Sequence, residues 1–84
     1  MFSLFFSNQA EKFLDKCDKE LRDRVLDKIK LLQNEPVPHK AVRVKGEENQ
    51  FRIRIGDYRA LYDIYWKENR ILVIKVDKRG RVYD

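Results

Sequence analysis

Cysteine, histidine, proline and glycine are all scarce in this 84-residue sequence, which holds one Cys, one His, two Pro and three Gly. The single cysteine, Cys17, excludes an internal disulfide and any zinc site built from several cysteines. The single histidine, His39, excludes a histidine pair as acid and base, and its place just after two prolines indicates a surface loop. No repeat, low-complexity segment or linker interrupts the chain. We therefore expect one domain over residues 1–84.

Long hydrophobic runs are also missing. No apolar stretch approaches the roughly 20 residues that a membrane-spanning helix needs. The apolar residues 1–6 are too few for a signal peptide and lack its basic start. We therefore expect a cytoplasmic protein with no membrane partner. Hydrophobic residues make up 43% of the chain, which is an ordinary share for a chain that folds.

Charge, in contrast, is abundant, since 39% of the residues are charged against about 25% in a typical domain. The net charge is +5. Residues 1–40 carry eight basic and seven acidic side chains, whereas residues 41–84 carry eleven and seven. The basic excess of the second half favours a polyanion as ligand, with a merely solubilising surface as the alternative.

The first residues predict a short strand followed by a helix. Phe2, Leu4 and Phe6 alternate with their neighbours, which is typical of a strand. Either Ser7 or Asn8 can then cap the N-terminus of a helix, because the side-chain oxygen of such a residue accepts from a backbone N–H of the first turn.

Residues 8–34 carry apolar side chains at the spacing of an amphipathic helix. The pattern alone permits one long helix. Asp18, however, offers a second N-cap in the middle, and a helix of about 27 residues is long for so small a domain. We therefore predict two helices, with the second ending before Pro36 because the residue preceding a proline disfavours helix.

The second half alternates in the manner of β-strands and contains polar turns. The apolar run over 71–76 is typical of a central strand with both faces partly covered. Strands are expected over 41–45, 50–55, 58–66 and 71–76. The order β-α-α-β-β-β-β predicts an α+β fold, with the N-terminal strand in a small antiparallel sheet and a two-helix hairpin packed on one face.

Residues 56–57, Gly-Asp, are typical of a two-residue hairpin turn with glycine first. Such a turn fixes the register, placing Arg54 opposite Arg59 with Arg52 on the same face. Like charges directly opposed destabilise a sheet, so we expect an anion bound between these arginines. The alternative is an exposed edge that charge protects against aggregation. The opposite, core face of the hairpin should collect Phe51, Ile53, Ile55, Tyr58, Ala60 and Tyr62.

The C-terminal segment adds to this set. Arg79, Arg81 and Tyr83 alternate, so an extended chain would place all three on one side. These three side chains can therefore add to the anion site expected at the hairpin arginines. The alternatives are a frayed basic terminus for the arginines and a packing role for Tyr83.

The stretch FRIRIGDYRALY at 51–62, followed by VDKRGRVY at 76–83, resembles the RelE/ParE superfamily of toxins from type II toxin–antitoxin pairs. KAVRVKG at 40–46, the N-terminal strand and the helical hairpin extend the resemblance over nearly the whole chain. RelE-type members cut messenger RNA in the ribosomal A site. The resemblance therefore implies a RelE-like fold and a metal-independent endoribonuclease that inhibits translation. It also implies a RelB-like cognate antitoxin bound in a hetero-oligomer, the ribosome and mRNA as further partners, and no cofactor.

The resemblance also implies which residues act. Arg52 and Arg54 match two basic strand positions where relatives often have lysine, Arg59 matches the arginine of a Tyr-Arg pair, and Arg79 and Tyr83 match late basic and tyrosine positions. Because arginine does not deprotonate in proteins, a lysine general base is unavailable at either strand position.

RNA cleavage by a 2′-hydroxyl needs a base, cations for the transition state and an acid for the leaving oxygen. Tyr83 is the expected base, because nearby positive charge favours its ionisation. Arg54 and Arg79 are expected to stabilise the transition state. Arg79, Lys78 and water all remain candidates for the acid. Phosphates would be held by Arg52, Arg59 and Arg81.

Rival functions remain open. The basic face lacks clustered carboxylates, which disfavours metal-dependent nuclease chemistry. A ParE-like member would inhibit DNA gyrase by protein–protein contact and would not need the arginine set. A non-catalytic RNA-binding module would use the arginines without cleavage, and a catalytically silent member would serve only its antitoxin complex.

Overall fold

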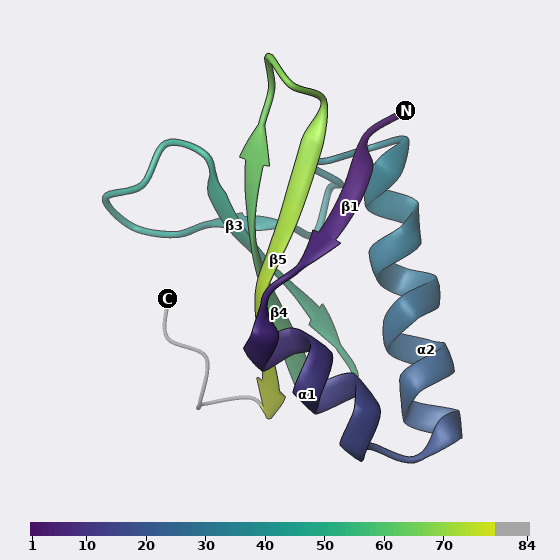
Figure 1. The fold of residues 1–84 in the computed structure, drawn as a ribbon. Helices are drawn as coiled ribbons and strands as arrows, with labels where there is room; N and C mark the ends of the chain where they lie inside the picture. The colour runs from purple at the N-terminus through teal and green to yellow at the C-terminus, as the bar shows by residue number, and fades with distance from the viewer. Residues whose placement is uncertain (79–84) are drawn as a thin grey trace.

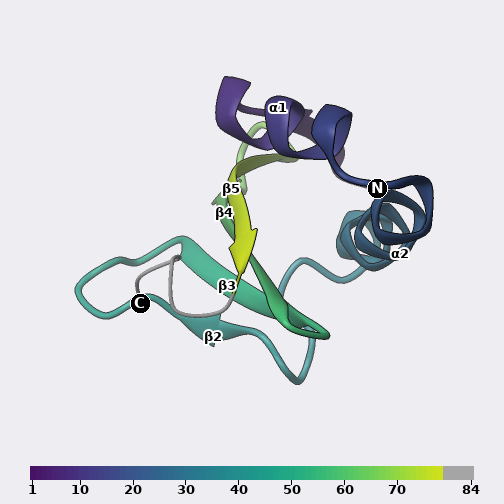
Figure 2. The same ribbon diagram turned by 90° about the horizontal axis from the view of Figure 1, so that it is seen from below.

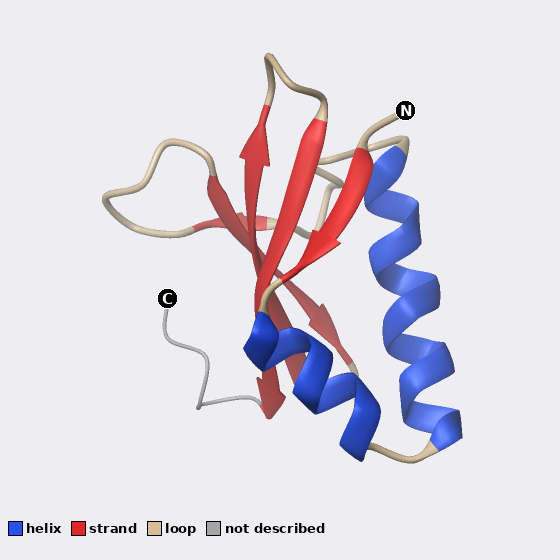
Figure 3. Cartoon of the chain, in the orientation of Figure 1, coloured by secondary structure: helices blue, strands red, loops and turns tan. Residues whose placement is uncertain are grey.

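The computed structural model describes residues 1–78, which form an α+β fold of five strands, two α-helices and a short 3-10 helix (Figures 1 and 3). The predicted fold class is confirmed, while the predictions on Arg79, Arg81 and Tyr83 lie outside the described residues. In chain order the elements are β1 (Ser3–Phe6), α1 (Asn8–Lys16), α2 (Lys19–Lys30), η1 (Leu31–Gln33), β2 (Val42–Arg43), β3 (Gln50–Ile55), β4 (Tyr58–Tyr65) and β5 (Arg70–Lys78).

The strands form one sheet in the order β1-β5-β4-β3-β2. Strands β2 to β5 pair antiparallel, as predicted, whereas β1 lies parallel to β5 with Phe5 opposite Leu72. A tight turn forces its two strands to run antiparallel. Both helices and three strands separate β1 from β5 along the chain, so no turn sets the direction of β1, and the sheet is mixed.

Strand β2 is shorter than the predicted strand over 41–45. It spans only Val42–Arg43, because the chain turns at its end. The Val44 N–H donates to Gln50 O at 2.9 Å, the Glu47 N–H donates to Val44 O at 3.0 Å, and Gly46 has a φ of 84°. A positive φ of this size favours glycine, so the polar turn begins inside the predicted strand.

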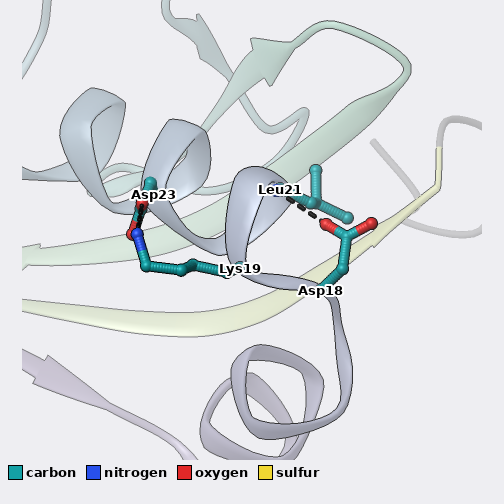
Figure 4. Close-up of polar contacts among 4 residues, drawn as sticks. All are labelled: Asp18, Lys19, Leu21 and Asp23. Atoms are coloured by element: carbon teal, nitrogen blue, oxygen red, sulfur yellow. Dashed lines mark hydrogen bonds and ion pairs between the residues drawn. The ribbon is translucent and has the colours of Figure 1, made fainter.

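Two helices form rather than one, as predicted. Cys17 and Asp18 are extended, with ψ of 162° and 165°, and break the helical path. The Asp18 carboxylate accepts from the Leu21 N–H at 2.8 Å and caps α2 (Figure 4). Ser7, one of the two predicted candidates, caps α1 by accepting from the Ala10 N–H at 3.1 Å.

Arg22 closes the other end of α1 from its position on α2. Its Nε donates to Leu14 O at 2.7 Å, and one terminal nitrogen donates to Cys17 O at 3.1 Å and to Asp15 O at 3.4 Å. The last carbonyls of a helix lack intrahelical partners, so a cation that donates to them fixes the helix end. These hydrogen bonds tie the end of α1 to α2.

The core lies between the helices and one face of the sheet. Figure 2 shows both helices on the same side of the twisted sheet. The fully buried side chains include Val25 and Ile29 of α2 and Ile71 and Val73 of β5. The predicted core face of the hairpin is confirmed: its members are buried except for Tyr58, which is half-buried and packs edge-on against Phe13 at a ring separation of 5.6 Å.

Strand β5 continues past the end of β1, and a side chain from α1 takes the place of the missing strand. Gln9 Oε1 accepts from the Val76 N–H at 3.1 Å, and Gln9 Nε2 donates to Val76 O at 3.2 Å. The Ser7 hydroxyl donates to Ile74 O in the same way. These contacts satisfy backbone groups that an open sheet edge would otherwise expose.

Tyr62 is fully buried and ties the sheet to the loop after the helices. Its hydroxyl donates to Pro36 O at 2.7 Å, and its ring stacks on Phe51 at 6.1 Å. Burial disfavours the phenolate, so it raises the pKa of Tyr62 well above its usual value.

The raised pKa of Tyr62 predicts a loss of stability at alkaline pH. The folded state holds the phenol proton more tightly than the unfolded state, so this contribution is complete below about pH 10 and decreases as the pH rises beyond it, by up to about 1.4 kcal/mol per pH unit. Urea unfolding at pH 8 to 11 measures it. Tyr62→Phe should cost about 1 kcal/mol at pH 8 and reduce the alkaline loss. A steep alkaline loss that persists unchanged in Tyr62→Phe, and disappears in Tyr65→Phe instead, would contradict this account.

Candidate functional site

The β3–β4 hairpin has the predicted register. Arg54 pairs with Arg59 and Arg52 pairs with Leu61, around a turn in which Gly56 has a φ of 60°. Residues paired across an antiparallel ladder point to the same face. The structure therefore brings Arg52, Arg54 and Arg59 together on the sheet face opposite the helices.

The three arginines differ in how they are held. Arg54 is exposed, and its Nε donates to Gly56 O at 3.3 Å. Arg52 and Arg59 are half-buried, and their Nε atoms are buried. A stem that lies along the sheet loses little further freedom when the guanidinium binds a ligand, so these two side chains are suited to hold an anion in a defined place.

Arg59 stands between two charges of opposite sign. Arg54 lies opposite it on β3, and Asp77 lies opposite it on β5. Asp77 therefore places one negative charge beside the two opposed arginines. Lys78, the last described residue, pairs with Tyr58 one position further along.

The same face carries an apolar cluster that no pattern in the sequence indicated. Val44 and Leu61 are buried, at 5% and 4% exposure, and Ile74 packs against them. The β4–β5 register shifts between Leu61 and Tyr62, because Leu61 pairs with Lys75 while Tyr62 pairs with Val73. Ile74 is the extra residue of this β-bulge, and the bulge turns its side chain toward the open face. The apolar run over 71–76 had predicted that both faces of β5 are partly covered, and this is confirmed.

A groove of about 470 Å³ lies at the far end of this face from the arginines. Its apolar walls come from Phe5, Tyr65 and Leu72, and its rim carries Glu68 and Arg70. The Arg70 guanidinium lies 5.3 Å from the centre of the Phe5 ring, which is a cation–π distance. Phe5 and Tyr65 are 47% and 43% exposed, so the open face presents both charge and apolar surface.

The remaining chemically active side chains do not assemble into a site. His39 is exposed in its loop, as predicted. The half-buried Cys17 thiol donates to Leu14 O at 3.4 Å, at the end of α1. Across residues 1–78, no three His, Cys, Asp or Glu side chains gather in a way that could hold a metal ion. Within the same residues, neither helix has the length and apolar content to span a membrane.

Comparison with known proteins connects this geometry to a family. Residues 4–83 match the family described as the ParE toxin of the type II toxin–antitoxin system parDE. A proposed RelE1 toxin of Methanocaldococcus jannaschii is 31% identical over 58 residues, which are 66% of this chain and 64% of that protein. The match therefore spans less than two thirds of the relative's length.

Solved structures of RelE toxins superpose on almost the whole of this chain. The RelE–RelB complex of Pyrococcus horikoshii OT3 contains a chain that is 30% identical, with a TM-score of 0.79 and coverage of 96% of this chain and 98% of that one. The isolated RelE toxin of E. coli has a TM-score of 0.84 at 21% identity, with coverage of 98% and 88%. At that identity, the E. coli structure supports the fold alone.

Two arginines offer a direct test of which side chains maintain the fold. Arg54→Ala should change the free energy of unfolding by no more than about 0.5 kcal/mol, because Arg54 is exposed and makes one long hydrogen bond. Arg22→Ala should cost about 1.5–3 kcal/mol, because it removes a charged donor from three carbonyls at the end of α1. Urea unfolding of both variants measures the difference. A comparable loss in Arg54→Ala would mean that the opposed arginines are structural.

Proposed function

The chain belongs to the ParE toxin family of type II toxin–antitoxin systems, and we propose that it is a RelE-type toxin that cuts messenger RNA on the ribosome and so inhibits translation. The observation that carries the proposal is the like-charged pair Arg54 and Arg59 beside Arg52 on the open sheet face. Arginines that face each other repel, a bound anion relieves that repulsion, and guanidinium groups match phosphate oxygens. An RNA backbone supplies those oxygens.

The proposed reaction is metal-independent transfer within the RNA. Tyr83, as the phenolate, takes the proton of a 2′-hydroxyl, the 2′-oxygen attacks the neighbouring phosphorus, and the bond from phosphorus to the 5′-oxygen breaks. The 5′-oxygen receives a proton from Lys78 or water, because an arginine such as Arg79 keeps its proton in proteins. Arg54 and Arg79 stabilise the added negative charge on the phosphorus oxygens.

The other basic residues position the substrate. The half-buried stems of Arg52 and Arg59 support a role in fixing the flanking phosphates, and Arg81 would add a further phosphate contact. Tyr83 and arginines form a weak acid–base set by themselves. Such a set suits an enzyme whose substrate geometry comes from the ribosomal A site, because orientation alone can supply much of a rate enhancement. A toxin that acts on ribosomes and messenger RNA would work in the cytoplasm.

We also propose a cognate RelB-like antitoxin that covers the open face in a hetero-oligomer. Relatives solved as RelE–RelB complexes support this partner. The face itself offers basic residues for acidic side chains, and the apolar groove at Phe5 and Leu72 for an apolar side chain. A disordered segment that folds on binding can cover such an extended, mixed surface.

A second candidate function is gyrase inhibition of the ParE type. The match of residues 4–83 favours it, because the matching family is described as the ParE toxin of the parDE system. A ParE-like toxin would act by protein–protein contact, which requires no row of arginines facing an anion. The arginine set therefore favours RNA over gyrase.

Cleavage should depend on Arg54 and Arg79. Primer extension on a message translated with purified protein should show cuts at ribosome-bound positions. Arg54→Ala and Arg79→Ala should each reduce the rate by on the order of 10²–10³-fold, the usual effect of losing a group that stabilises transition-state charge. Lys30→Ala removes an exposed charge from α2 and is the control. If the message stays intact while the protein blocks DNA supercoiling by gyrase, the ParE-type function is the correct one.

Substitutions at Tyr83 should separate proton transfer from stacking. Tyr83→Phe keeps the ring and removes only the hydroxyl, so a large loss of ribosome-dependent cleavage in this variant supports the role of base. A loss confined to Tyr83→Ala indicates stacking on a nucleobase, worth roughly 1–3 kcal/mol. Unchanged cleavage in both variants would remove Tyr83 from the site and leave the arginines as the catalytic groups.

A further inference from the structure

Arg24 reaches from α2 to the turn of the β3–β4 hairpin. Its Cζ and one terminal nitrogen lie 3.9 Å, and its other terminal nitrogen 4.0 Å, from the place that a Cβ on Gly56 would take. Three nearly equal distances mean that the flat guanidinium lies face-on against the glycine. Its N–H groups therefore point sideways, away from the turn, where a ligand can accept from them.

Arg54 approaches the same glycine from the strand. Its Nε donates to Gly56 O at 3.3 Å, so two guanidinium groups flank one residue. Between α2 and the hairpin lies a groove of about 290 Å³, and its charged lining consists of Arg24, Lys28, Arg54 and Asp27. Three cations thus face one carboxylate, although they come from two elements that are distant in the sequence.

The ion pair of α2 lies outside this groove. Lys19 and Asp23 form an ion pair at 2.9 Å near the start of the helix, as Figure 4 shows. Among the described residues 1–78, it is the one ion pair found for α2, and it does not include Arg24. The Arg24 side chain is exposed, and its guanidinium lies beside the turn at Gly56 with its donors open to a ligand.

We propose that this groove binds a phosphodiester of RNA, so that the RNA-binding surface continues from the open sheet face around the hairpin turn onto α2. The inference rests on the proposed function and names a part of the surface outside the arginine row. Arg54 connects the two parts, since it belongs to the row on β3 and also lines the groove. Fork-shaped donors at a convergence of positive charge favour phosphate oxygens, and an RNA strand presents phosphates in series.

Binding to RNA tests the groove directly. The probes are a labelled single-stranded RNA and 70S ribosomes carrying a message with an empty A site, each titrated at 50 to 300 mM KCl. Arg24→Gln removes the charge and the fork while keeping most of the length. The slope of log affinity against log salt should fall by about 0.7 for a lost single-strand phosphate contact. Lys30→Gln removes the same charge from the same helix outside the groove and should leave the slope unchanged.

The outcomes are distinct. A reduced slope on both probes assigns the groove to the message, and a reduced slope on ribosomes alone assigns it to ribosomal RNA; both support the proposal. Unchanged slopes in a protein that binds RNA overturn the groove while leaving the proposed function intact, as does a loss of antitoxin affinity in place of RNA affinity. A wild-type protein that binds neither probe overturns the proposed function itself. Melting curves of Arg24→Gln and Arg24→Lys establish that the variants are folded.

Discussion

The two-residue turn between β3 and β4 is the constraint on which the rest of the structure depends. Gly56 takes a φ of 60°, which a residue with a Cβ rarely adopts, and the chain reverses between Ile55 and Tyr58. The turn sets the pairing of every residue in the hairpin. A slip of one residue would move the apolar side chains to the open face and bury the arginines. Turn chemistry thus determines both the core and the candidate site.

Because of this register, the two faces of the sheet carry different kinds of side chain. The helix-covered face buries the apolar side chains and supplies the stability of the fold. The open face places Arg54 and Asp77 on either side of Arg59. Asp77 beside Arg59 and the small cluster around Leu61 keep this face in order. The surface that we propose to bind RNA is therefore carried by a sheet whose stability comes from its other face.

Local patterns in the sequence predicted much of this. Asp18 indicated the break between the helices, and the Gly-Asp turn indicated the register and hence the shared face of Arg52, Arg54 and Arg59. Arg79, Arg81 and Tyr83 stay predictions, because the described residues end at Lys78.

Features that depend on tertiary packing could not be predicted in the same way. The parallel pairing of β1 with β5 joins residues from opposite ends of the chain, and no turn encodes it. The bulge at Ile74 looks like any other position of an apolar run. Arg22 on the end of α1 and Arg24 on Gly56 are ordinary surface arginines in the sequence. Only the packing of α2 gives them their neighbours.

A structure of the protein on the ribosome tests most directly the claim that the open sheet face holds RNA. Arg54→Ala, which should slow cleavage without unfolding the protein, would be bound to a 70S ribosome with an intact message and imaged by electron cryomicroscopy. We expect the message against the face formed by β3, β4 and β5, with Arg52 and Arg59 at its phosphates. A message that lies against the helices, or a protein that occupies no position near the A site, would contradict it.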